Sequence, residues 1–301
     1  LQSLDQLTEE VFGPILHVIR YKAEQLPEVI QQINNTGYGL TLGIHSRIEA
    51  FAETVYRNTI AGNTYINRNM VGAVVGVNPF GGRGLSGTGP KAGGPNYLLR
   101  FSTSKAPMDS PEAYSPELNH SPHNTKAVST AMQAMAKWQA TSIDSRLLII
   151  KQCAPEFAPI IEPIAREKLA NPTQLPGPTG ESNMLSLHPK SALLCAGPGT
   201  AAATAQAKAV RALGGHAIEA KGHFDPTSLT NGPAYGGVIW WGDHKTARRL
   251  EQALADRSGP IIALITGQPD RAHVLRERHI CVDTTASGGN AALLEATSSS
   301  D

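Results

Sequence analysis

The stretch SALLCAGPGTAAATAQAKAVRALGGHAIEA, residues 191–220, decides the fold class of this chain. Its first six residues are mostly apolar and have the length of a buried strand. A Gly-Pro-Gly turn follows, and glycine and proline interrupt regular structure. The alanine-rich run 200–213 favours a helix, and the run 216–220 favours another strand. The stretch therefore predicts a strand, a turn, a helix and a second strand.

The same alternation continues toward the end of the chain. The apolar runs 237–241, 260–266 and 279–282 are predicted to be strands, and 244–255 is predicted to be a helix. Short apolar strands that alternate with helices form a parallel sheet covered on both faces. We therefore expect a doubly wound, Rossmann-like α/β domain that continues the series begun at residue 191.

The Gly-Pro-Gly turn has the position of a phosphate-binding turn, between a strand and a helix. It lacks the GxGxxG spacing, because Ala202 stands at the third position, and Asp225 lies beyond the tip of the second strand. The turn therefore predicts a Rossmann-like fold that binds no nucleotide.

A second block of regular structure occupies the first part of the chain. Apolar residues at helical spacing predict helices over 25–34 and 47–58. Strands are predicted over 40–45, 62–67 and, at a sheet edge, 97–102, and the glycine-dense run 81–95 predicts a close-turned loop.

The two blocks are separated by residues 105–125, which are rich in proline and serine and predict an extended linker. The predicted domains are therefore 1–104 and 126–301. Helical patterns open the second domain at 126–140 and 145–169, and the prolines inside the latter predict a kinked or divided helix.

Composition excludes several classes of protein. The formal net charge is +1 and there is no long basic run, so no nucleic-acid surface is expected. The chain has neither a bilayer-length apolar run nor a signal peptide, so a cytoplasmic location is expected. Cys153, Cys195 and Cys281 are odd in number and widely spaced, which predicts buried thiols and neither a disulfide framework nor a metal site.

Several motifs in the first block carry a family resemblance. EEVFGP at 9–14 and NPFGG at 78–82 resemble signatures of the aldehyde dehydrogenase superfamily, and GAVVG at 72–76 with SGTGPKAGGP at 86–95 resembles its L-glutamate-γ-semialdehyde dehydrogenase branch. LPGPTGESN at 175–183 and VDTTASGGNA at 282–291 resemble the C-terminal domain of long, bifunctional proline utilization A proteins. The resemblance implies the C-terminal portion of a catalytic domain followed by a second, non-catalytic domain of the same superfamily.

The resemblance also implies roles for five residues. Glu10 is expected to accept hydrogen bonds from the nicotinamide ribose of NAD, and Phe12 is expected to pack near the nicotinamide. Gly72 and Ala73 are expected to offer backbone N–H groups to the α-carboxylate of L-glutamate γ-semialdehyde. Phe80 is expected to form an apolar wall, or to be an ordinary core aromatic residue.

The family's chemistry needs a cysteine nucleophile and a glutamate base, and no segment of this chain resembles the nucleophile motif. No catalytic residue is therefore assigned, and the chain is interpreted as part of a longer polypeptide. The resemblance implies a homo-oligomer, and it places FAD and membrane contact in an upstream proline dehydrogenase domain. Two hypotheses stay open. The residues either complete an enzyme, favoured for 1–104, or form a non-catalytic assembly or active-site-enclosing module, favoured for 126–301.

Overall fold

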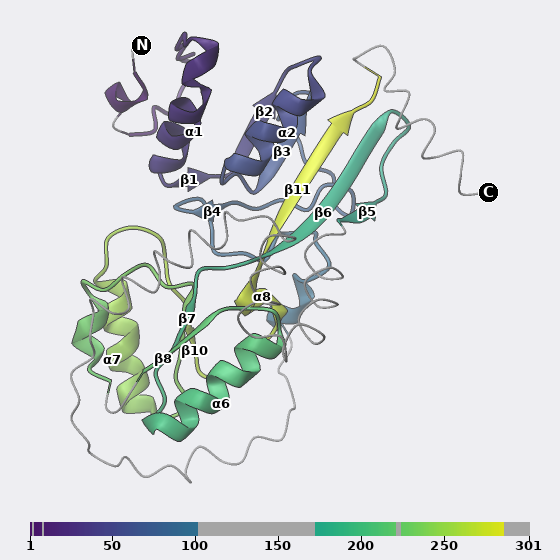
Figure 1. The fold of residues 1–301 in the computed structure, drawn as a ribbon. Helices are drawn as coiled ribbons and strands as arrows, with labels where there is room; N and C mark the ends of the chain where they lie inside the picture. Colours follow the sequence, from purple (N-terminus) through teal and green to yellow (C-terminus); the bar gives the residue numbers. More distant parts are fainter. Residues whose placement is uncertain (2, 8, 102–171, 221–223, 286–301) are drawn as a thin grey trace, which may run out of the picture.

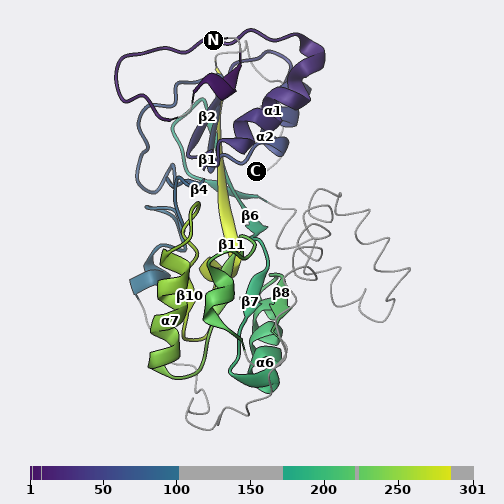
Figure 2. The same cartoon turned by 90° about the vertical axis from the view of Figure 1, so that its left-hand side faces the viewer.

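The computed structural model describes residues 1–101, apart from 2 and 8, and residues 172–285, apart from 221–223. Strands from both parts of the chain form a five-stranded sheet in the order β2-β3-β11-β6-β5. A second, separate sheet has four strands in the order β10-β9-β7-β8. Figures 1 and 2 show the long strands β6 and β11 of the five-stranded sheet extending toward the four-stranded sheet.

The five-stranded sheet joins segments that are far apart in the sequence. Its members are β2 (Thr41–Ile44), β3 (Asn63–Ile66), β5 (Thr173–Leu175), β6 (Glu181–Pro189) and β11 (Leu275–Asp283). Strand β3 pairs in parallel with both β2 and β11, and β11 pairs antiparallel with β6 along its whole length. The first block and the C-terminal block are therefore held together by backbone hydrogen bonds.

Two helices cover one face of this sheet, and both were predicted. They are α1 (Leu26–Asn35) and α2 (Glu49–Asn58). Their apolar faces pack with Ile44 and Ile66 of the sheet and with Ile280 of β11. Helix α1 is followed by Gly37, whose φ of +75° is a left-handed conformation that glycine adopts at little cost.

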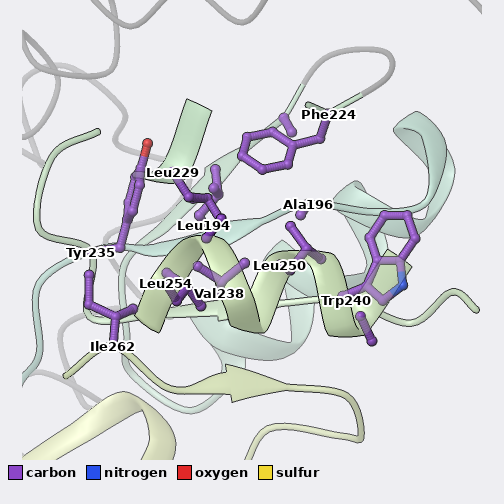
Figure 3. Close-up of a cluster of buried hydrophobic side chains, with 13 residues drawn as sticks. Leu194, Ala196, Phe224, Leu229, Tyr235, Val238, Trp240, Leu250, Leu254 and Ile262 are labelled. Atoms are coloured by element: carbon purple, nitrogen blue, oxygen red, sulfur yellow. The ribbon is translucent and has the colours of Figure 1, made fainter. Parts of the chain in front are cut away.

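The four-stranded sheet confirms the parallel α/β prediction. Its strands are β7 (Leu193–Cys195), β8 (Ala217–Glu219), β9 (Gly237–Ile239) and β10 (Leu264–Ile265), all paired in parallel. Helix α6 (Gly199–Ala212) and helix α7 (His244–Ala255) pack against it. Figure 3 shows Leu250 and Leu254 of α7 pointing at Leu194 and Val238 in the buried cluster.

Short elements connect these parts. They are η1 (Leu4–Gln6), η2 (Ala23–Gln25), η3 (Leu98–Phe101), η6 (Pro226–Leu229), α8 (Arg271–Val274), and a two-stranded pair of β1 (Tyr38–Gly39) with β4 (Arg83–Gly84).

Two expectations need correction, and two strands were missed. The strand predicted at 279–282 exists, but it belongs to β11 in the five-stranded sheet and not to the parallel series, because its partners are β3 and β6. Strands β5 and β6 were not predicted at all. An edge strand was predicted at 97–102, but Leu98–Phe101 form η3, because a turn bond from the Arg100 N–H to the Tyr97 carbonyl, 3.1 Å, curls the chain. The predicted linker and the helices at 126–140 and 145–169 lie outside the described residues.

Candidate functional site

The predicted substrate loop is an exposed turn after β3. Gly72 and Gly76 have φ angles of +82° and +81°, in the left-handed region where a side chain would be strained. The N–H groups of Val77 and Asn78 donate to the Val74 carbonyl, at 3.0 and 2.7 Å, which closes the turn. The loop is therefore an ordered backbone structure that glycine makes possible.

Gly72 and Ala73 are exposed on this turn. Within the described residues, no hydrogen bond uses the backbone N–H of either residue. Phe80, at the end of the same segment, is half-buried, and its backbone forms an antiparallel bridge with Ala92. The structure therefore places the three predicted substrate residues on one continuous segment.

Glu10 and Phe12 lie on an irregular, exposed segment, and Phe12 is 94% exposed. Among the described residues, no hydrogen bond joins 9–14 to the loop at 72–80. Both side chains are accessible to a ligand, and their assignment to the ribose and the nicotinamide stays a prediction. The described hydrogen bonds therefore do not link Glu10 or Phe12 to the substrate loop.

Beneath the loop lies a buried group of side chains that sequence reasoning missed. This polar cluster consists of Asn63, Asn78, Lys91, Asn183 and His279, each at most 2% exposed. Asn63 Oδ1 accepts from Lys91 Nζ at 2.7 Å, and Asn183 Oδ1 accepts from Asn78 Nδ2 at 2.8 Å. Because a buried polar group costs free energy when it is unpaired, losing one member of the cluster should destabilise the fold.

His279 links Asn63 and Asn183 in one protonation state. Asn63 Nδ2 donates to His279 Nδ1, 3.3 Å, so the ring must donate from Nε2 to Asn183 Oδ1, 3.2 Å. Burial, with the positive charges of Lys91 and Arg68, lowers the pKa of His279 to about 4. The imidazole is therefore neutral at pH 7.

Lys91 is a structural cation and does not reach the exposed face of the loop. Its ammonium donates to Asn63 Oδ1 and to the Gly81 carbonyl, and its backbone N–H donates to Glu277 Oε2 at 2.7 Å. Burial lowers the pKa of Lys91 to about 8, while Glu277 acts in the opposite direction.

The two described cysteines are poor nucleophiles. Burial raises the pKa of Cys195 to about 12. Burial also raises the pKa of Cys281, although the Arg68 guanidinium lies 3.0 Å from its sulfur and opposes the shift. A thiol with a raised pKa carries little reactive thiolate at neutral pH, and Cys153 lies outside the described residues.

Other kinds of site receive no support from the described part of the chain. There, no group of three or more metal-ligating side chains converges. In the same residues, no helix is long and apolar enough to cross a bilayer.

The exposed glycine turn and the NPFGG segment lie within residues 2–107, which match a model of the aldehyde dehydrogenase family.

The chain is similar over almost its whole length to a much larger protein. It is 36% identical to the bifunctional protein PutA of Salmonella typhimurium, over 98% of this chain and 23% of that protein. Residues covering 31% of the chain are 47% identical to 1-pyrroline-5-carboxylate dehydrogenase 1 of Halalkalibacterium halodurans, over 18% of that protein. The chain therefore spans less than a quarter of the length of these relatives.

A solved structure supports the fold. Proline utilization A from Corynebacterium freiburgense superposes with a TM-score of 0.54 at 24% identity, over 92% of this chain and 26% of that one. The likeness concerns the arrangement of the elements, including those of the C-terminal block.

Proposed function

We propose that the chain forms part of an NAD-dependent L-glutamate-γ-semialdehyde dehydrogenase that acts in proline catabolism to glutamate. The proposal rests on the exposed turn at 72–77, where the N–H groups of Gly72 and Ala73 make no hydrogen bond to any residue that the structure describes. Small residues let an anion approach the backbone closely. An α-carboxylate is the anion that the semialdehyde offers, and it distinguishes this substrate from simple aldehydes.

The remaining roles follow from the family resemblance. Phe80 would supply an apolar wall beside the aldehyde chain, Glu10 would accept from the ribose hydroxyls, and Phe12 would lie against the nicotinamide. NAD, when bound, would accept the hydride of the oxidation. The cysteine nucleophile and the glutamate base would come from another part of a longer polypeptide, as would an FAD-dependent proline dehydrogenase domain.

A second role is favoured for the C-terminal block by one specific observation. Strand β11 adds directly to β3, the strand that leads into the substrate loop, and β6 adds to β11. This block would therefore serve as a non-catalytic module that supports or encloses the active-site region. We also propose that the protein forms a homo-oligomer.

Replacing Gly72 with valine in the intact dehydrogenase tests the substrate assignment. Valine is β-branched and strongly disfavoured at a φ of +82°, so the turn should open and the N–H groups should move away from the carboxylate. We expect KM for the semialdehyde to rise about tenfold, the loss of one good charge-assisted hydrogen bond, with the affinity for NAD unchanged.

The matched control is Gly214→Val. Gly214 has a φ of +85° and open space around it, but it follows helix α6, in the C-terminal block. It should lower stability and leave KM unchanged. An unchanged KM in the Gly72 variant would remove the carboxylate assignment.

A further inference from the structure

Asn183 of β6 connects the C-terminal block to the substrate loop. The residue is fully buried. Its Oδ1 accepts from Asn78 Nδ2 at 2.8 Å and from His279 Nε2 at 3.2 Å, and its Nδ2 donates to Glu181 Oε2 at 3.4 Å. A single amide therefore joins the strand to a residue 105 positions away in the sequence.

Asn78, in turn, determines the conformation of the loop. Its Oδ1 accepts from the Val74 N–H at 3.1 Å, and its own N–H donates to the Val74 carbonyl at 2.7 Å. The side-chain amide must point its oxygen toward Val74 for the first bond to exist. Because Asn183 offers an acceptor, only the Nδ2 end of Asn78 can face it, and this fixes the orientation of the Asn78 amide.

Asn183 is itself held in place by further contacts at both ends of its amide. Gly177 lies so close that a Cβ there would stand 2.6 Å from Asn183 Nδ2. The neutral His279 ring donates to the same oxygen that Asn78 uses. The C-terminal block, which carries no predicted catalytic residue, therefore offers Asn183 Oδ1 to the loop as a fixed acceptor.

We propose that Asn183 is a positioning residue for the dehydrogenase: through Asn78 it holds the 72–77 turn in the shape that receives the substrate's carboxylate. This inference rests on the function proposed above. When the acceptor is lost, Asn78 is free to rotate, and substrate binding must then order the turn. The cost should appear in KM for the semialdehyde and not in kcat, because Asn183 is linked to the turn only through Asn78.

The test is Asn183→Leu in the intact dehydrogenase, which removes the acceptor and keeps a similar volume. We expect KM for the semialdehyde to rise about tenfold, with kcat unchanged. For a short aliphatic aldehyde that lacks the carboxylate, KM should not change. Hydrogen exchange at the Val74 amide should become faster, because Asn78 no longer holds it.

Met184→Ala is the matched control, since Met184 is the next residue of β6 and packs against the apolar cluster on the opposite face. It should lower stability without raising KM or speeding exchange at Val74. If it reproduces the Asn183→Leu phenotype, the effect is general destabilisation and the proposal is overturned. Asn78→Leu combined with Asn183→Leu should raise KM no more than either change alone, and additive effects would also overturn it.

Failure of this inference differs from failure of the proposed function. If Gly72→Val raises KM for the semialdehyde and Asn183→Leu does not, the carboxylate loop stands and Asn183 does not position it. If neither change raises KM while exchange at Val74 becomes faster, the mechanical link exists but the loop does not bind the substrate, and both proposals fall.

Discussion

Replacing Asn63 with leucine is expected to lower the free energy of unfolding by about 3–5 kcal/mol, the range for breaking a buried charged network by removing one partner. Asn63 is fully buried on β3. Its Oδ1 accepts from Lys91 Nζ at 2.7 Å and from the Gly81 N–H at 3.1 Å, and its Nδ2 donates to the Pro79 carbonyl at 2.8 Å. Leucine fills the space but satisfies none of these groups.

Urea unfolding followed by circular dichroism would measure this loss. The double variant Asn63→Leu/Lys91→Met should recover about 1–2 kcal/mol, because it also removes the uncompensated ammonium. The exposed Asn35→Leu is a control that should change stability by less than about 0.5 kcal/mol. If Asn63→Leu also costs less than that, the buried hydrogen bonds of Asn63 do not stabilise the folded chain.

The parts of the fold that sequence reasoning predicted are those with local signals. Helix α1 has apolar residues at helical spacing and a glycine directly after its last turn, and both signals lie within a dozen residues. Strands β7 and β9 are apolar on both faces because helices cover both sides of a parallel sheet. Such patterns need no knowledge of distant partners.

Strand β6 was missed because it has no such local pattern. Asn183, Ser186 and His188 interrupt its apolar residues, and a strand with polar side chains on both faces resembles a loop. These side chains find partners only in the folded chain. Asn183 is paired with Asn78 and His279, and Ser186 lies within hydrogen-bonding distance of Tyr56 and His188.

The residues of the candidate site also differ in whether a local sequence pattern could identify them. Gly72, Ala73 and Phe80 lie on one segment, so a motif could identify them together. The members of the polar cluster come from five segments, and Asn63 and His279 are 216 positions apart. They become neighbours only because β3 pairs in parallel with β11, with His279 opposite Asn63. No local pattern in the sequence indicates that register.

His279 should make the chain unstable in acid. The pKa of His279 is lowered from an ordinary 6.5 to about 4, first by burial and then by the charges of Lys91 and Arg68. Between these two values the unfolded chain binds a proton that the folded chain does not bind. Stability therefore falls as the pH is lowered from about 6.5 to about 4 and is unaffected by this group above that range. The shift corresponds to a loss of about 3 kcal/mol.

The measurement is the free energy of unfolding in urea at several pH values between 4 and 7, for the unchanged chain and for His279→Gln. Glutamine keeps an N–H donor for Asn183 Oδ1 but cannot take up a proton, so the slope in this range should become much shallower. Carboxylates titrate in both proteins and cancel in the comparison. The exposed His17→Gln should leave the slope unchanged. Equal slopes for His279→Gln and the unchanged chain would mean that the imidazole can be protonated without breaking its bond from Asn63, and the neutral ring assigned to the cluster would be wrong.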